Sequence, residues 1–353
     1  MTIRDVALRA GVSIAAVSRA LNQSGYVSNE IKQRVHEAVR ELHYRPHDSA
    51  RGLKLQRTNT IGLVIADITN PFYAELAAGV LSSAKKWGYY VILAAMDEDP
   101  AQEAEYLNVL MEKRVDGILA VATGQNAHLW REAIDLGIKV VLVDRKIASL
   151  PDADVVLLDN VKGGYDATAY LTALGHRRIG IMSGPLSTTT GQGRLQGYYK
   201  ALEDASLPID PELVQMVSFK RKSGIQAVDH LLALRKPPTA IFATNNLIGE
   251  TAMFALRARG VSVPGTISLI MFDDVPWASL TMPSLTVIAQ PISLLGNHAV
   301  EQLVQRLQHP DLPISEGRTI MLEPELIVRE SCAPPLPLPI TEIERQAGPY
   351  PSS

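Results

Sequence analysis

The sequence predicts an α/β protein in which doubly wound parallel sheets form a two-lobed body, preceded by a small three-helix head. Three observations predict this fold class. The 353 residues exceed the roughly 100 to 200 expected of one domain. From residue 60 onwards, short apolar runs alternate with helical patterns over about 260 residues. The first 57 residues are basic, whereas the remainder is acidic.

The charge asymmetry separates the head from the body. Residues 1–57 carry ten Lys or Arg and five Asp or Glu, a net charge of +5, which leaves −8 for the remainder. A basic module attached to an acidic body is typical of a protein that binds nucleic acid through one part and performs another task with the other.

The head divides into three short helical patterns. The first covers residues 3–10, where apolar residues recur at spacings of three and four and Thr2 is placed as the N-cap. Gly11 then supplies a left-handed turn, and Ser13 is placed to cap the second helix. The third pattern opens at Ser28. Two helices joined by so short a turn must cross steeply, which predicts a helix-turn-helix.

The body alternates strands and helices. Continuous apolar runs predict buried parallel strands in TIGLVIAD, YYVILAAM, DGILAVA, VVLVD, VVLLD, RIGIMSG, AIFATN, ISLIMFDD and TVIAQP. Helical patterns lie between them at 72–87, 101–114, 126–136, 163–174, 194–205, 223–234, 247–259 and 292–308. The proline-rich tail, 333–353, has no apolar periodicity and is expected to be disordered.

Several classes of protein are excluded by composition. No apolar run reaches the roughly 18 residues of a membrane span, and the N-terminus lacks the pattern of a secretory signal, so a cytoplasmic, nucleoid-associated protein is expected. Cys332 is the only cysteine, which excludes an internal disulfide and cysteine-based metal clusters. His43, His176 and His230 have no second histidine at metal-ligand spacing and are expected in solvated or capping roles.

No enzyme signature is present either. GQGRLQG (191–197) misses the dinucleotide-binding spacing by one residue, and neither a phosphate-binding GxxxxGK[ST] motif nor HExxH occurs. We therefore expect no catalytic residues, no cofactor and no metal. A transport-type sugar-binding protein with no regulatory role is an alternative, but it would lack the basic head.

The quoted motifs resemble a known family. IRDVALRAGVSIAAVSRALN, followed by YVS, ELHYRP and ARGLK, is similar to the head and hinge of the LacI/GalR family of bacterial transcription regulators. The resemblance implies a DNA-binding head at 1–45, a hinge helix and linker at 46–59, and a periplasmic-binding-protein-like body at 60–332. The body would comprise lobe 1 at about 60–160 and 291–321, and lobe 2 at about 161–290 and 322–332. The chain would cross between lobes near residues 160, 290 and 321.

The resemblance also implies which residues contact DNA. The second helix would enter the major groove and residues 46–56 would fold as a hinge helix that inserts Leu53 into the minor groove of a near-palindromic operator. The expected contacts are Thr2, Ser13, Ile14, Ala15, Ser18, Arg19, Asn22, Tyr26, Arg51, Leu53 and Lys54. Ile14 and Ala15 can contact thymine methyl groups but offer no hydrogen bonds, which leaves Arg19 as the main polar reader of bases.

The expected effector site lies at the carboxyl ends of the strands, which face the cleft of such a fold. Carboxylates, amides, guanidinium groups and aromatic rings gather at these positions, and this mixture suits the hydroxyls and apolar face of a sugar. The residues are Asn70, Phe72, Tyr73, Asp144, Arg145, Arg194, Phe219, Asn245, Asp273 and Gln290. The set resembles the pocket of ribose-type repressors, whereas purine-type repressors carry an arginine where this chain has Thr188.

The predicted protein is a homodimeric repressor of sugar uptake or catabolism genes, and its operator affinity would be controlled by a bound monosaccharide. Two arginines could instead clamp the carboxylate of a sugar acid such as gluconate or ketogluconate, and the sequence leaves both kinds of ligand open.

Overall fold

The computed structural model describes residues 1–22, 25–44, 58–218, 221–309 and 317–336. The chain forms two compact units, Met1–Thr58 and Asn59–Ser353. Within the described residues, no helix is both long enough and apolar enough to cross a membrane.

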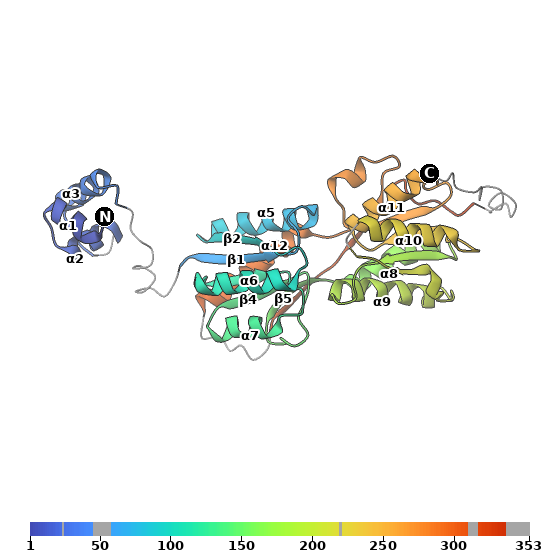
Figure 1. Cartoon of the computed structure of the whole chain (residues 1–353), viewed down its shortest axis with the longest axis horizontal. Helices are drawn as coiled ribbons and strands as arrows, with labels where there is room; N and C mark the ends of the chain where they lie inside the picture. The colour runs from blue at the N-terminus through green and yellow to red at the C-terminus, as the bar shows by residue number, and fades with distance from the viewer. Residues whose placement is uncertain (23–24, 45–57, 219–220, 310–316, 337–353) are drawn as a thin grey trace, which may run out of the picture. The chain divides into compact units, whose positions relative to one another are not determined.

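The first unit holds three helices, α1 (Ile3–Ala10), α2 (Ile14–Asn22) and α3 (Asn29–Glu41), around one small core (Figure 1). Val6, Val17 and Val35, one from each helix, are fully buried in this core. Gly11 adopts a φ of 64° at the end of α1, as the turn between α1 and α2 requires. An added Cβ at this glycine would also meet the guanidinium of Arg34, which donates to the carbonyl of Ala10 at 2.6 Å.

Lobe 1 of the second unit is a six-stranded sheet in the order β11-β5-β4-β3-β1-β2, with all five pairings parallel. Its strands are β1 (Thr60–Ile65), β2 (Tyr90–Ala95), β3 (Gly117–Ala120), β4 (Lys139–Val143), β5 (Asp154–Leu158) and β11 (Thr319–Leu322). Its helices are α5 (Pro71–Lys86), α6 (Pro100–Glu112), α7 (Ala127–Asp135) and α12 (Ile292–Gln308). Helix α5 packs against α12 and α6 against α7, one pair on each face (Figure 1).

Lobe 2 repeats this plan in the order β12-β10-β9-β8-β6-β7. Its strands are β6 (Ile179–Ser183), β7 (Val214–Met216), β8 (Ala240–Ala243), β9 (Ser268–Phe272), β10 (Thr286–Ala289) and β12 (Glu325–Ile327). Its helices are α8 (Asn160–Ala173), α9 (Thr189–Asp204), α10 (Arg221–Ala233) and α11 (Asn246–Ala258), with short 3₁₀ turns at Pro211–Leu213 and Pro276–Ser279. Strand β12 is antiparallel to β10, the one such pairing among the described strands.

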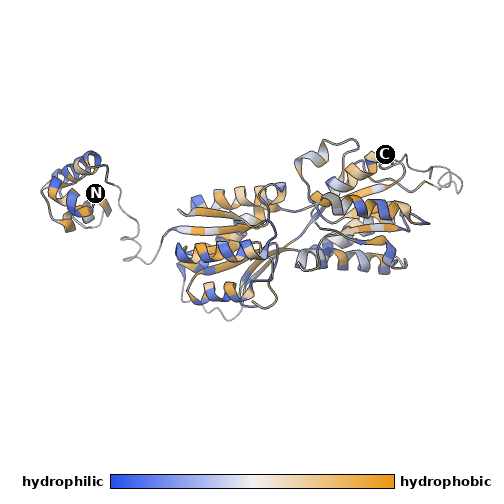
Figure 2. Cartoon of the chain, viewed as in Figure 1, coloured by the Kyte–Doolittle hydropathy of each residue, from blue (hydrophilic) through white to orange (hydrophobic). Residues whose placement is uncertain are grey.

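The chain passes between the lobes three times, after β5, after β10 and between β11 and β12. The strands at the centre of both sheets are apolar along their length (Figure 2). Because the carboxyl ends of parallel strands lie at one edge of each sheet, this arrangement brings the loops after β1, β4, β6, β8 and β9 to the junction of the lobes.

Two expectations about burial are wrong. The run YYVILAAM was predicted to be a buried strand, but β2 is an edge strand on which Tyr90 is 78% exposed and both Ile92 and Leu93 are exposed. An edge strand has a neighbouring strand on one side only, so its side chains have fewer neighbours than those of a central strand and stay partly exposed. His176 was expected in a solvated or capping role, but it is buried, and Thr239, Ser268 of β9 and the Ala333 carbonyl surround its ring.

Candidate functional site

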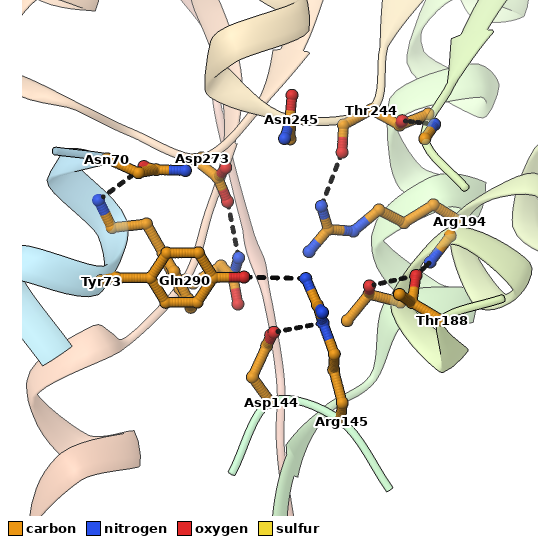
Figure 3. Close-up of a pocket in the computed structure, with 14 residues that line it drawn as sticks. Asn70, Tyr73, Asp144, Arg145, Thr188, Arg194, Thr244, Asn245, Asp273 and Gln290 are labelled. Atoms are coloured by element: carbon orange, nitrogen blue, oxygen red, sulfur yellow. Dashed lines mark hydrogen bonds and ion pairs between the residues drawn. The ribbon is translucent and has the colours of Figure 1, made fainter. Parts of the chain in front are cut away.

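Strand ends from both lobes surround one small cavity (Figure 3). Nine of the ten predicted effector-site residues line it: Asn70, Phe72, Tyr73, Asp144, Arg145, Arg194, Asn245, Asp273 and Gln290. The tenth, Phe219, lies outside the described residues. Polar strand ends that are distant in sequence therefore lie at one place in the fold.

Three helices begin at this cavity, each capped by a side chain that lines it. The Asn70 carboxamide oxygen accepts a hydrogen bond from the Phe72 N–H at 3.0 Å at the start of α5. Thr188 Oγ1 accepts from the Gly191 N–H at the start of α9, and the Asn245 oxygen accepts from the Ile248 N–H at the start of α11. The capping requirement of each helix fixes the position of these polar groups.

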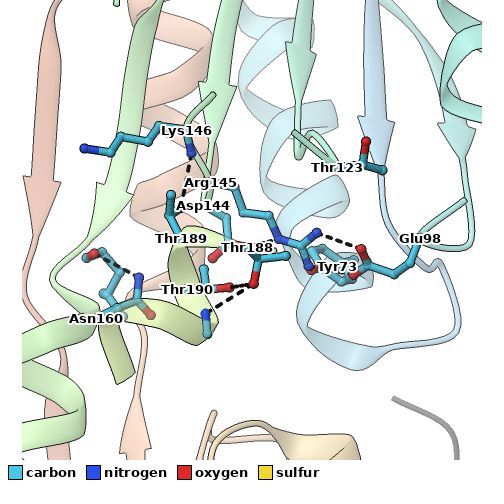
Figure 4. A network of polar contacts seen from close by, with 12 residues as sticks. Tyr73, Glu98, Thr123, Asp144, Arg145, Lys146, Asn160, Thr188, Thr189 and Thr190 are labelled. Atoms are coloured by element: carbon cyan, nitrogen blue, oxygen red, sulfur yellow. Dashed lines mark hydrogen bonds and ion pairs between the residues drawn. The ribbon is translucent and has the colours of Figure 1, made fainter. Parts of the chain in front are cut away.

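Arg145 is the most constrained charged side chain of the cavity. It is only 3% exposed, and its two terminal nitrogens donate to both carboxylate oxygens of Glu98 at 2.7 and 2.6 Å (Figure 4). One of these nitrogens also donates to the Tyr73 hydroxyl oxygen at 2.9 Å. Burial alone would lower the pKa of Arg145, but Tyr73, Glu98 and Asp144 raise it, so the guanidinium stays charged.

Asp144 lies beside Arg145, with 3.7 Å between its Oδ2 and the arginine Nε. Burial raises the pKa of Asp144 to about 6, against the opposite effect of Arg145 and Arg194. Its other oxygen, Oδ1, has no hydrogen-bond partner although it is buried. The same holds for Arg145 Nε and Gln290 Oε1, which belong to residues of the cavity lining, and for Asn246 Oδ1, whose side chain bonds the lining residues Asn70 and Asp273. Four of the six buried side-chain polar atoms without a hydrogen-bond partner in the described residues therefore lie at or beside the cavity. Buried polar atoms are normally hydrogen-bonded, so these atoms can receive water or the polar groups of a ligand.

Asp273 holds Asn246, the residue of lobe 2 that contacts Asn70 of lobe 1. Its Oδ1 accepts from the Gln290 amide at 2.6 Å, and its Oδ2 accepts from the backbone and side-chain N–H groups of Asn246. The Asn246 side chain also donates to Asn70 Oδ1 of lobe 1 at 2.9 Å. The hydrogen bond between Asn246 and Asn70 therefore joins the two lobes beside the cavity.

Arg194 projects into the cavity from α9 (Figure 3). Its Nε donates to Asn160 Oδ1 at 2.8 Å, and its Nη1 donates to the carbonyl of Thr244 at 2.6 Å. The guanidinium stacks 3.6 Å from the centre of the Phe272 ring. These contacts fix the guanidinium plane before any ligand arrives.

The cavity is small in this conformation. Its volume is about 30 Å³, room for one or two water molecules. A larger cavity of about 560 Å³ adjoins it and shares Asn70, Tyr73, Thr188 and Asn245 with it. A monosaccharide therefore needs the side chains or the lobes around the inner cavity to separate.

The head presents a second candidate surface, on α2. Ile14, Ala15 and Arg19 are exposed, whereas Val17 and Ala20 are buried on the opposite side. Arg19 Nε donates to the Ala15 carbonyl at 3.3 Å, which holds the arginine along the exposed face. Thr2 and Ser13 are exposed at the starts of α1 and α2, where Ser13 Oγ accepts from the Ala16 N–H, and Tyr26 is 90% exposed.

The structure describes only some of the remaining predicted DNA contacts. Ser18 is partly exposed, and Asn22 is the last residue of α2. Arg51, Leu53 and Lys54 lie outside the described residues.

Comparison with protein families identifies both units. Residues 2–47 match the model of bacterial regulatory proteins of the lacI family, and residues 58–319 match periplasmic binding proteins and the sugar-binding domain of that family. The chain belongs to the LacI family. It is a DNA-binding transcriptional regulator, as the sequence motifs predicted, and the predicted fold class is confirmed.

Individual relatives within the LacI family are similar along almost the whole chain. The transcriptional regulator DegA of Bacillus subtilis (strain 168) is 38% identical, and the ribose operon repressor of Haemophilus influenzae is 36% identical; each alignment covers 94% of this chain and 98% of the relative. A crystal structure of the Lac repressor dimer bound to operator and an anti-inducer superposes with a TM-score of 0.81 at 27% identity, covering 94% of this chain and 99% of that one.

The structure adds site residues that the sequence did not reveal. Glu98 follows β2 and Thr244 follows β8, both at strand ends, so the rule that found Asp144 would have found them too. Asn246 also follows β8, but it is the first residue of α11, and the sequence analysis chose its neighbour Asn245 instead. The described residues contain no group of three or more His, Cys, Asp or Glu placed to hold a metal ion.

Proposed function

We propose that this regulator binds a monosaccharide in the cleft between its lobes and that this binding changes its affinity for operator DNA. The unpaired buried polar atoms around the inner cavity carry this proposal. Asp144 Oδ1 and Gln290 Oε1 accept hydrogen bonds, Arg145 Nε donates one, and a sugar hydroxyl can do both. The rings of Phe72 and Tyr73 pack edge to face, with 5.0 Å between their centres, and supply an apolar wall for the sugar ring.

Coupling to DNA follows from the position of the ligand between the lobes. Because a monosaccharide does not fit the inner cavity as it stands, its binding must displace contacts such as that between Asn70 and Asn246. The ligand then favours a different arrangement of the lobes, and ligand and operator affinities change each other by the same factor.

The test uses full-length protein and DNA enriched by that protein from a random duplex library. Fluorescence anisotropy of the enriched DNA is followed during titration with pentoses, hexoses and sugar acids. We expect one of them to change the operator affinity, and the proposal fails if none does.

A variant pair ties the response to the cavity. Asp273→Asn should reduce effector affinity by about tenfold or more, because a charge-assisted hydrogen bond is worth about 1.5–3 kcal/mol. Asp135→Asn removes an equal charge from an exposed position on α7 and should have no effect. Equal responses of both variants would place the ligand elsewhere.

We propose that the regulator acts in the cytoplasm and that its helix α2 reads operator bases. In this proposal Ile14 and Ala15 contact thymine methyl groups, and Arg19 is the main polar reader. Leu53 of the predicted hinge lies at the centre of the operator. Arg19→Ala should weaken binding to the enriched DNA by about 1–3 kcal/mol and relax selectivity at a single guanine. A uniform loss on enriched and random DNA would contradict base reading by Arg19.

We also propose that the regulator works as a homodimer. Lobe 1 exposes a patch of apolar side chains on α5 and β2 and in the turn between them, here called the β2 patch: Leu81, Trp87, Tyr90, Ile92 and Leu93. Helix α5 packs against β2, so these residues belong to one region of the lobe. An apolar edge strand favours pairing with another chain, and a second copy is the partner that a palindromic operator requires.

A further inference from the structure

We propose that Glu98 makes the cleft selective for uncharged polyhydroxyl ligands and excludes ligands that carry a carboxylate. The inference rests on the proposed function, because it names the chemical class of effector that the same cleft accepts. It decides between the two ligands that the sequence leaves open, a neutral monosaccharide and a sugar acid.

The first observation is that the arginine best placed to hold a ligand carboxylate is already occupied. Both terminal nitrogens of Arg145 donate to Glu98, at 2.6 and 2.7 Å, in the two-pronged geometry that a carboxylate ligand would need (Figure 4). Its Nε faces Asp144. Glu98 thus takes the place of a ligand carboxylate, and an acid must displace it to reach the arginine.

The second observation is the balance of charge. Three carboxylates, Asp144, Asp273 and Glu98, lie around the two guanidinium groups of Arg145 and Arg194. The described charged residues that line the outer cavity are all acidic, namely Asp67, Asp97, Glu98 and Asp99. An anionic ligand would add a negative charge to a site that already carries an excess of negative charge, where low exposure to water strengthens repulsion.

The third observation concerns the polar atoms that lack partners. Of the four unpaired atoms at the site, Asp144 Oδ1, Asn246 Oδ1 and Gln290 Oε1 can only accept a hydrogen bond, and Arg145 Nε can donate one. An ionised carboxylate has no proton to donate, whereas each hydroxyl of a neutral sugar has one. The unpaired atoms therefore match a polyol better than an acid group.

The helix starts at the cavity do not offset this preference. The first turns of α5, α9 and α11 could favour an anion through their N–H groups. Asn70, Thr188 and Asn245 already accept hydrogen bonds from these turns. Their side chains stand between the helix ends and a ligand.

The test measures binding of matched pairs of an aldose and its aldonate, ribose with ribonate and glucose with gluconate, to full-length protein by calorimetry. Wild type should bind an aldose more tightly than its aldonate. Glu98→Gln should shift the ratio of the two affinities toward the aldonate by at least about tenfold, because Arg145 loses its neutralising partner. Glu98→Ala should give the same shift, since the lost charge is the cause.

Glu105→Gln is the matched control, because it removes one carboxylate from an exposed position of α6 and should leave the ratio unchanged. Tighter binding of an aldonate by wild type, or an unchanged ratio in both Glu98 variants, would overturn the inference and leave sugar sensing intact. If wild type binds neither member of any pair and no sugar alters operator affinity, the proposed function fails together with it.

Discussion

Asp144 is the residue through which pH should act on ligand binding. It is 3% exposed, and burial raises its pKa to about 6. In the proposed site its ionised form accepts a hydrogen bond from a sugar hydroxyl, so protonation removes an acceptor. We expect effector affinity to fall as the pH drops from about 7.5 to about 5, with the midpoint set by the ligand-free pKa. Calorimetry across this pH range measures the effector affinity. An equally steep fall of affinity in Asp144→Asn would contradict the prediction.

His176 should make the folded state less stable in acid. Thr239 lies 2.8 Å from its Nδ1, and Ser268 and the Ala333 carbonyl lie 3.1 and 3.0 Å from its Nε2. Burial lowers its pKa below the ordinary 6.5. Below about pH 6.5 the unfolded chain therefore binds more protons than the folded chain at this site, and this contribution to the free energy of unfolding falls as pH falls.

Asp144 has the opposite effect in the same range, because its pKa is raised on folding and its protonation stabilises the folded state. The slope of stability against pH must therefore be compared between variants. His176→Gln should remove the acid-sensitive part, so its melting temperature should decline less between about pH 7 and about pH 5 than that of wild type. A slope equal to that of wild type would show that His176 does not titrate in this range.

At the scale of elements, the close contact of α8 and α9 positions Arg194 at the cavity. A Cβ at Gly197 would overlap the Val161 carbonyl oxygen, so only glycine allows this approach. The same contact holds Asn160 of α8 against Arg194 of α9. Gly197→Ala should force the helices apart, lower the free energy of unfolding by about 1–3 kcal/mol and weaken effector binding.

Gly79→Ala in α5 is the control for this variant. Its added Cβ would come no closer than 3.7 Å to Ser293, an ordinary contact, so stability and effector binding should stay close to wild type or improve slightly. Denaturant unfolding measures the free energy of unfolding, and calorimetry measures effector binding. If the two variants behaved alike, the closeness of α8 and α9 would not be what positions Arg194.

The elements also show which strands and helices the sequence patterns could predict. Long apolar runs such as those of β1 and β9 were found, because burial on both faces leaves a continuous apolar segment. Helix α9 begins at Thr189 rather than at 194, because TTTGQG has poor helix propensity and the contact with α8 overrides it. Strands β7, β11 and β12 were not predicted, because they are short edge strands with partly exposed side chains, so no continuous apolar run marks them.

The candidate site was largely predictable for a similar reason. Asp144, Asn245 and Asp273 directly follow apolar runs, so the topology of a parallel sheet places them together. The pairing of Arg145 with Glu98 could not be predicted, because it depends on the path of a loop in which Asp97 and Glu98 both adopt positive φ. That pairing changes the expected ligand class, since it neutralises one of the two arginines that made a sugar acid plausible.

At the scale of the whole molecule, assembly should depend on the β2 patch. Leu93 is 39% exposed at the centre of this edge strand, and a charge there must be desolvated if the strand becomes buried in a dimer. We expect Leu93→Asp to shift the protein toward monomers in sedimentation velocity. Affinity for the enriched operator should fall by about a hundredfold or more, because two linked heads bind far more tightly than one.

Leu136→Asp is the control for this substitution, because Leu136 is 65% exposed at the end of α7, in the helix pair on the other face of the lobe 1 sheet from α5. It introduces the same charge and should leave both sedimentation and operator binding unchanged.

Ligand binding by the Leu93→Asp monomer separates effector binding from DNA binding, since the cavity is lined by residues of a single chain. The monomer should therefore still bind the effector. A Leu93→Asp protein that remains dimeric would place the subunit interface on another surface, and a monomer that cannot bind the effector would mean that the cleft depends on the partner subunit.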